Sequence, residues 1–294
     1  MIRVGPAGWS YPDWEGRVYP RNKGRGFHGL AFLAETFDCL EVNSSFYAIP
    51  VARSTSRWAE MLRPFPNFRL TAKLYQGFTH RAESDSELGW EEDAARYRAG
   101  VAPLMRESRL DALLVQFAVS FQHGASALRR LAKIRNLFSE HKLVLEVRHS
   151  SWFTPSSLHE IRGLGYSLAH IDLPPAWNHP PDWHPVTGPV GYLRLHGRNA
   201  KNWFRREATR DDRYDYLYDN SELESLVGKA RRIASDVDAT YVVTNNHFEG
   251  QAIANGIEMQ HMLTGKPVNA SHEIVRAFPS LARFTQAHGQ AELF

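Results

Sequence analysis

The sequence predicts an α/β fold, a single-domain (β/α)8 TIM barrel. Segments rich in β-branched and aromatic residues alternate with segments whose apolar residues recur at helical spacing. Such alternation predicts a parallel sheet, and about eight repeats over about 265 residues fit a closed barrel. No Pro, Gly or Ser-rich linker divides the chain, so one domain is expected over 1–294. An open doubly wound sheet is the alternative architecture.

The expected strands share β-branched and aromatic residues and end in polar or turn residues. They cover 2–7, 38–43, 67–74, 110–117, 142–148, 166–172, 190–196 and 239–245.

Helices are expected between these strands, among them 29–36, 52–62, 124–139, 221–235 and 250–263. Ser221 followed by Glu224 predicts a capping box at the start of the fourth of these helices. Five prolines in 173–188 predict a loop. Residues 264–294 are expected to form a peripheral extension of coil and helix.

Composition and charge indicate which broad class of protein this chain belongs to. The chain has 294 residues, 43% of them hydrophobic and 23% charged, which excludes disorder, collagen and coiled coil as its main state. A net charge of +3 is too small to indicate a nucleic-acid protein. The single cysteine, Cys39, lies in an apolar run and is expected to be a small buried residue. With no signal peptide and no long apolar window, a cytoplasmic protein without a membrane partner is expected.

Polar side chains gather where the expected strands end, which is where barrel enzymes place their catalytic residues. Side chains two apart on a strand share a face, so these polar residues are expected to point into the barrel mouth. Their apolar neighbours Val42, Val147, Ile171 and Leu195 are expected to face the helices. The polar sets are Glu41 with Asn43 and Ser45, Glu146 with Arg148, His170 with Asp172, and Arg194 with His196, joined by Lys73, Gln116, Asn245, Asn246 and His247.

Several motifs together resemble the DUF72 (YecE-like) family over residues 2 to about 263. They are GWSYPDW (8–14), LEVNSSFYAIP (40–50), LTAKL and FTH (70–80), LLVQF and SF (113–121), LEVRHSSWF (145–153), YLRLHGRN (192–199), RYDYLY (213–218) and NNHFEGQAIAN (245–255). The resemblance implies a TIM barrel but no activity. One departure is Ala118-Val119, where the family usually has a proline pair. The family's likeness to barrel endonucleases of the endonuclease IV type is an analogy of fold.

Anion binding accounts best for the charges at the mouth. Arg148 and Arg194 are predicted to grip a phosphate or carboxylate, with Lys73 as a point charge. His196 is the predicted general acid or base, with Glu41 or Glu146 as its partner and Asp172 as a further catalytic candidate. The other predicted substrate contacts are Asn43, Asn245, Asn246, His247, Gln116, Trp9, Tyr47, Arg198 and Tyr214.

The segment 197–218 interleaves basic and aromatic residues. This composition suits a lid over the mouth, or stacking on bases and binding of phosphates in a nucleic acid. It also suits a solvated excursion in which the arginines pair with Asp211, Asp212 and Asp215.

Other kinds of site stay open. The carboxylates and histidines at the mouth are also the ligand types of a metal-dependent nuclease, and Glu41 with Glu146 are the residue types of a glycosidase pair. A purely structural, ion-paired plug is a further alternative. Gly24 to Gly29 match G-x-G-x-x-G but follow no strand, so neither a dinucleotide nor any other cofactor is expected. The sequence leaves the oligomeric state open.

Overall fold

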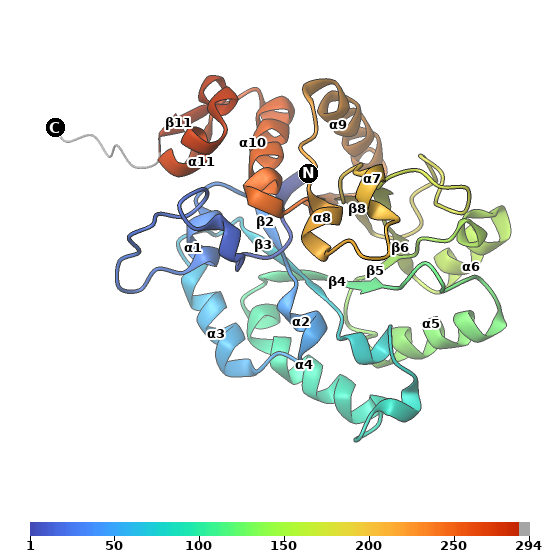
Figure 1. Cartoon of the computed structure of the whole chain (residues 1–294). Coiled ribbons are helices and arrows are strands. Elements are labelled where there is room, and N and C mark those ends of the chain that lie inside the picture. The colour runs from blue at the N-terminus through green and yellow to red at the C-terminus, as the bar shows by residue number, and fades with distance from the viewer. Residues whose placement is uncertain (288–294) are drawn as a thin grey trace.

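The computed structural model describes residues 1–287, in which parallel strands form a ring surrounded by helices (Figure 1). One sheet has the order β2-β3-β4-β5-β6 and a second has the order β1-β9-β8-β7. The strands are β1 (Ile2–Pro6), β2 (Cys39–Val42), β3 (Arg69–Lys73), β4 (Leu110–Gln116), β5 (Leu143–Glu146), β6 (Tyr166–Leu168), β7 (His170–Asp172), β8 (Val190–Leu195) and β9 (Ala239–Thr244).

The two sheets meet along two seams, so that the strands follow one another around the ring. At the first seam the Gly8 amide donates to the Glu41 carbonyl at 2.8 Å, linking the end of β1 to β2. At the second, β6 and β7 follow each other directly around Ala169, and the Val190 amide donates to Ser167 Oγ at 3.0 Å. The order of strands is that of the (β/α)8 fold, and the predicted fold class is confirmed.

Helices connect successive strands, and the longer ones lie outside the ring (Figure 1). They are α1 (Gly29–Ala34), α2 (Ser44–Tyr47), α3 (Ala52–Met61), α4 (Trp90–Arg106), α5 (Ala125–Leu137), α6 (Pro155–Gly163), α7 (Ala200–Trp203), α8 (Arg210–Tyr214), α9 (Asn220–Ala234), α10 (Gln251–Thr264) and α11 (His272–Ala277).

Most expected elements are present, with three differences. The expected strand 166–172 is interrupted at Ala169 and becomes β6 and β7. The capping box of α9 is formed by Asp219 and Glu222, not by Ser221 and Glu224, because the helix begins earlier than expected. Five further helices, α2, α4, α6, α7 and α8, lie outside the five ranges expected for helices between the strands. Residues 173–188 contain no helix or strand, as expected.

The ring encloses an apolar core that closes the barrel below the mouth. Cys39 belongs to this core and is buried, as expected. Larger clusters between the strands and the outer helices form the rest of the hydrophobic interior. The buried core residues inside the ring are Ala7, Cys39, Ala112, Leu114, Val144, Ala169, Val190, Tyr192, Tyr241 and Val243.

The C-terminal extension packs against this scaffold as far as it is described. Strand β10 (Val268–Ala270) pairs in parallel with β11 (Thr285–Ala287), and Ile274 of α11 is buried. The last part of the expected extension, 288–294, lies outside the described residues. None of the helices in residues 1–287 has both the length and the apolar character needed to cross a membrane.

Candidate functional site

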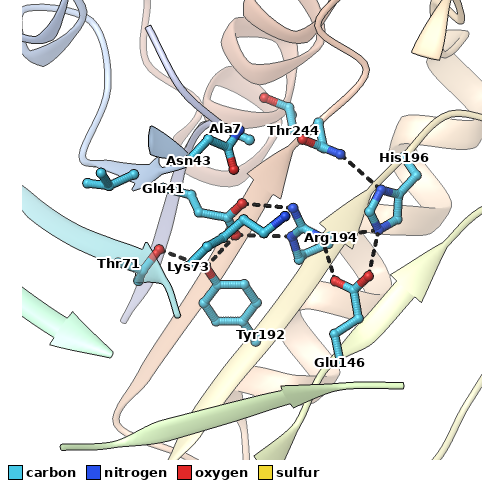
Figure 2. Close-up of polar contacts among 12 residues, drawn as sticks. Ala7, Glu41, Asn43, Thr71, Lys73, Glu146, Tyr192, Arg194, His196 and Thr244 are labelled. Carbon is cyan, nitrogen blue, oxygen red and sulfur yellow. Dashed lines mark hydrogen bonds and ion pairs between the residues drawn. The ribbon is translucent and has the colours of Figure 1, made fainter. Parts of the chain in front are cut away.

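Strand register decides which side chains reach the barrel interior. Tyr192 on β8 lies in the inner core, so Arg194 and His196, two and four residues later, follow it on the same face. Cys39 likewise sets the face of Glu41, and Val144 sets the face of Glu146. Figure 2 shows these side chains converging from opposite sides of the ring. The predicted inward orientation is confirmed for β2, β5 and β8.

Arg194 is the centre of this cluster and is 1% exposed. Its Nε and Nη2 donate to the two carboxylate oxygens of Glu41 at 3.0 and 2.7 Å, a bidentate arrangement. Its Nη1 donates to Glu146 Oε2 at 2.5 Å. Arg194 thereby links the carboxylates of β2 and β5 across the barrel, and each of its guanidinium nitrogens is occupied (Figure 2).

The two carboxylates have further partners. Tyr192 donates its hydroxyl to Glu41 Oε2 at 2.9 Å, and Arg148 donates through Nε and Nη2 to Glu146 Oε1 at 3.0 and 2.8 Å. Burial alone raises the pKa of Glu146, but Arg194 and Arg148 outweigh burial and hold it well below its usual value. Glu146 is therefore an ionised, charge-balanced group.

His196 lies next to Glu146 and is fully buried. Its Nδ1 accepts from Asn245 Nδ2 at 3.0 Å, and its Nε2 faces Glu146 Oε1 at 3.4 Å. Burial lowers its pKa to about 3, against the opposing effect of Glu146. His196 is thus a neutral imidazole with both ring nitrogens engaged.

Lys73, at the end of β3, differs from the arginines of the cluster. Its ammonium lies 4.3 Å from the centre of the Phe46 ring, and within residues 1–287 it makes no ion pair or hydrogen bond. Figure 2 shows its side chain pointing toward Arg194 and Glu41. Burial lowers the pKa of Lys73 to about 8, with Arg194 adding to the effect and Glu41 opposing it.

A pocket of about 480 Å³ opens beside Lys73 at the barrel mouth. Its walls combine aromatic rings with amides and a few cations, a composition typical of small-molecule sites. Tyr11 stacks on His247, with ring centres 4.5 Å apart, and burial lowers the pKa of His247 to about 4. The pocket is lined by Gly8, Trp9, Ser10, Tyr11, His28, Asn43, Ser44, Tyr47, Trp58, Lys73, Gln116, Arg194, Arg210, Tyr214, Asn245 and His247.

Residues 3–277 match the family described as "Protein of unknown function DUF72". The chain belongs to this family. It is 32% identical to a DUF72 family protein of Thermotoga maritima, whose structure gives a TM-score of 0.77 with 90% of this chain and 99% of that chain covered. A DUF72 family protein of Enterococcus faecalis is 28% identical, with a TM-score of 0.78 and coverages of 90% and 95%. The YunF protein of Bacillus subtilis is 25% identical over 273 residues, 90% of this chain and 95% of its own length.

The departure from the usual DUF72 sequence at Ala118-Val119 lies in a compact turn. The Phe121 amide donates to the Ala118 carbonyl at 3.0 Å. The Phe121 ring stacks on Phe117, with ring centres 3.7 Å apart, and on Trp152, with ring centres 5.3 Å apart. Aromatic packing therefore shapes this loop without the proline pair.

Nine of the predicted site residues line the pocket, and the others do not. Trp9, Asn43, Tyr47, Lys73, Gln116, Arg194, Tyr214, Asn245 and His247 line it. Although Arg194 reaches the wall, each of its three nitrogens donates to Glu41 or Glu146, so its bidentate pairing is made with Glu41 instead of a ligand. Arg148 pairs with Glu146 and lies 5.9 Å from the Trp203 ring instead of lining the pocket. The predicted catalytic residues Glu41, Glu146 and His196 form the support beneath the pocket.

The prediction that Asp172 points into the mouth is wrong. Ala169 and Ile171 pack with the inner core, so His170 and Asp172 face the helices. There Arg198 binds Asp172 through Nε at 2.9 Å and Nη2 at 2.7 Å, and Tyr218 donates its hydroxyl to Asp172 at 2.7 Å.

Arg198 and Asn246 are therefore away from the pocket as well. Arg198 also pairs with Glu222 of α9, at 3.0 Å. Asn246 donates to the Tyr216 carbonyl at 2.8 Å and to Asn255 Oδ1 at 2.9 Å. Both residues hold the segment after β8 against the outer helices.

Several lining residues were absent from the predicted site. Tyr11 lies in the GWSY run and Ser44 follows Asn43, so their places next to strand ends were a usable signal. Arg210 comes from α8 within the predicted lid segment. His28 and Trp58 come from outside the strand ends, and no local pattern marks them.

The candidate metal ligands do not assemble into a metal centre. Nowhere in the described part of the chain do three His, Cys, Asp or Glu side chains come close enough to hold an ion. Glu41 and Glu146 are bound to Arg194, and Asp172 lies on the opposite face of its strand.

Proposed function

We propose that the protein is an enzyme that acts on a small anionic substrate, such as a phosphorylated sugar or a nucleotide-like compound, in the pocket at the barrel mouth. The observation that carries the proposal is Lys73, a cation that pairs with no carboxylate of residues 1–287 and lines a pocket of about 480 Å³. Buried charges are ordinarily paired, so one that faces a cavity is suited to attract a ligand of opposite sign.

Arg210 is the second cation of the proposed site. It lines the pocket from α8, lies 5.7 Å from the centre of the Tyr11 ring and pairs with Asp211. An arginine can bind phosphate or carboxylate through parallel hydrogen bonds. We assign the substrate's anionic group to Arg210 at the rim, and its reacting end to Lys73 at the floor.

Proton transfer is assigned to Lys73 instead of His196. A general acid or base works best when its pKa is near the working pH. The pKa of Lys73, about 8, meets this condition, whereas that of His196, about 3, does not. The Arg194 cluster is then a support that fixes the position and charge of the pocket floor.

The aromatic residues of the pocket wall indicate which moiety the substrate carries besides its anionic group. Trp9, Tyr11, Tyr47, Trp58 and Tyr214 all line the pocket. Such rings stack on sugars or bases, and Asn43, Gln116 and Asn245 offer hydrogen bonds to hydroxyl groups.

Calorimetric titration with ribitol 5-phosphate, AMP and inorganic phosphate tests the proposal. We expect saturable binding of at least one organic phosphate, weakened about tenfold or more by Arg210→Gln and by Lys73→Met because each removes a pocket cation. The exposed Arg206→Gln is the matched control and should leave the affinity unchanged. Absence of binding, or equal affinity in all four proteins, would overturn the proposal.

The rim of the mouth supports a second candidate, binding of single-stranded nucleic acid. Trp177 is 91% exposed and Phe204 is 55% exposed, and Arg205 and Arg206 follow Phe204 directly. Exposed rings beside cations suit base stacking and phosphate contacts. Oligonucleotide binding that weakens steeply with salt and is reduced by Arg205→Ala and Arg206→Ala would support it, and no binding at low salt would remove it.

A further inference from the structure

We infer that Lys73 is a covalent catalyst, whose amine forms an imine with an aldehyde or ketone group of the anionic substrate. This inference rests on the proposed function, since it uses the same pocket, and it adds the chemical class of the reacting group. Its basis is the placement of Lys73: an amine that lines the pocket, is held by its backbone, lies next to a guanidinium and forms no ion pair with a carboxylate in residues 1–287.

The backbone of Lys73 is fixed from two sides. Its carbonyl accepts hydrogen bonds from Ser45 Oγ at 2.7 Å and from the Tyr97 hydroxyl at 2.9 Å. The Phe46 ring packs against the ammonium without competing for its protons. The side chain is therefore positioned, while its nitrogen stays open toward the pocket.

Arg194 makes the amine more reactive. A second cation beside a buried lysine disfavours the ammonium form, a known way of activating a lysine nucleophile. Arg194 is held in place by Glu41 and Glu146, so it cannot turn away from Lys73. With a pKa of about 8, about a tenth of Lys73 is the free amine at pH 7.

The step balances without any further reactant. The nitrogen lone pair of neutral Lys73 attacks the carbonyl carbon, and the C=O π electrons move to oxygen. That oxygen takes up a proton as nitrogen loses one, giving a carbinolamine. Solvent water then gives a proton to the hydroxyl, which leaves as water while the nitrogen lone pair forms the C=N bond. The resulting iminium returns its N–H proton to the hydroxide formed from that solvent water, so amine and carbonyl become imine and one water with no net proton consumed. The imine then holds the substrate on Lys73 without any change in oxidation state.

Other described lysines are placed differently. Lys23, Lys142 and Lys229 are paired with Glu15, Asp111 and Asp182, and Lys133 pairs with Glu91. Lys201 and Lys266 are exposed to solvent. Lys73 therefore combines partial burial and a place in the pocket wall in a way that these six do not, so selective labelling tests the inference.

The substrate class follows from the distribution of groups around the pocket. In this inference Lys73 takes the carbonyl and Arg210 takes the anion, and the amides of Asn43, Gln116 and Asn245 line the same pocket. A phosphorylated or carboxylated aldehyde or ketone that carries hydroxyl groups has the functional groups that these residues would bind.

Reductive trapping tests the inference with ribose 5-phosphate, which has an aldehyde form, against ribitol 5-phosphate, which has no carbonyl. The full-length protein is incubated with each compound and cyanoborohydride, and the adduct is located by peptide mass spectrometry. We expect one equivalent of ribose 5-phosphate on Lys73, with at least tenfold less on Lys201. Ribitol 5-phosphate should give no adduct. Lys201→Arg should label like the wild type.

Lys73→Arg separates this inference from the proposed function. It keeps the positive charge, so ribitol 5-phosphate should still bind within about threefold of wild type, whereas the adduct should be lost. Binding of ribitol 5-phosphate without labelling of Lys73 in the wild type would overturn the imine and leave the anion site standing. No binding of either compound would count against both. Labelling of Lys201 at the same rate as Lys73 would show ordinary surface reactivity and overturn the inference.

Discussion

Arg194 shows what a single residue can and cannot reveal in a sequence. Its face is predictable, because Tyr192, Arg194 and His196 alternate with apolar residues along one strand. The partners of Arg194 cannot be predicted in this way, because Glu41 and Glu146 lie on β2 and β5, on other sides of the ring. For the same reason Lys73, with equal charge and an equivalent strand-end position, could not be distinguished beforehand as the cation that stays open to the pocket.

Arg194→Met should destabilise the protein by about 3–5 kcal/mol. The substitution leaves Glu41 and Glu146 buried without their shared counter-charge, and uncompensated buried charges are costly. Chemical denaturation gives the free energy of unfolding. The exposed Arg206→Gln should change it by no more than about 0.5 kcal/mol. An equally small loss in Arg194→Met would show that the cluster does not stabilise the fold.

Among the elements, β7 and α9 show where patterns of local sequence mislead. The alternation in HID allows either face to point inward, and Ala169, a small residue between β6 and β7, gives no local sign of which. Ala169 and Ile171 pack in the inner core, so the side chain of Asp172 points toward the outer helices. At α9 the helix begins earlier than expected, and Asp219 and Glu222 form the capping box in place of Ser221 and Glu224.

Asp219→Ala should lower the free energy of unfolding by about 1 kcal/mol. Asp219 Oδ1 accepts from the Glu222 amide at 2.9 Å, and the Asp219 amide donates to Glu222 Oε2 at 3.0 Å. Ser225→Ala, at an exposed position later in the same helix, is the matched control, with an expected change within about 0.5 kcal/mol. Equal losses in the two variants, measured by urea denaturation, would contradict the observed cap.

The proline-rich loop 173–188 is fastened to β7 by two buried histidines. His170 stacks on His184 with ring centres 3.8 Å apart, and His170 Nε2 lies 2.9 Å from the His184 carbonyl. Burial lowers the pKa of His170 to about 3, with His184 as a further cause. The unfolded chain therefore binds this proton more readily than the folded one, and stability falls as the pH drops from about 6.5 toward 3.

His170→Phe should reduce this dependence while keeping an aromatic ring in the stack. Between pH 6.5 and 5.0 the variant should lose about 1–2 kcal/mol less unfolding free energy than the wild type. His159→Phe, at an exposed position on α6, should retain the wild-type slope. Identical slopes in all three proteins would rule out His170 as a source of the pH dependence.

At the scale of the whole molecule, the ring order was predictable and its seams were not. Eight strand segments in alternation with helices indicate a barrel from hydrophobic period alone. The seam between β1 and β2 depends on how closely two backbones approach. An added Cβ at Gly5 would lie 1.7 Å from the Cys39 carbonyl oxygen, so only glycine fits there.

Gly5→Ala should therefore destabilise the barrel by about 3 kcal/mol, since the obstructing atom is backbone and the strands must separate. Gly228→Ala is the matched control on α9, where an added Cβ meets nothing within 4 Å. It should stabilise the protein by about 0.5–1 kcal/mol, because alanine favours a helix. Thermal or chemical unfolding of both variants tests the seam, and a mild effect of Gly5→Ala would contradict it.

The balance of charges around Arg194 has a consequence for experiments that search for a ligand. Lys73, Arg148 and Arg194 carry three positive charges, whereas Glu41 and Glu146 carry two negative ones, so one cationic charge stays uncompensated beside the pocket. A small inorganic counter-ion from the buffer will tend to occupy the place of the substrate's anion. Phosphate and sulfate buffers should then act as competitors of any true ligand, so screens in a bulky, weakly coordinating buffer should detect ligands that phosphate buffer conceals.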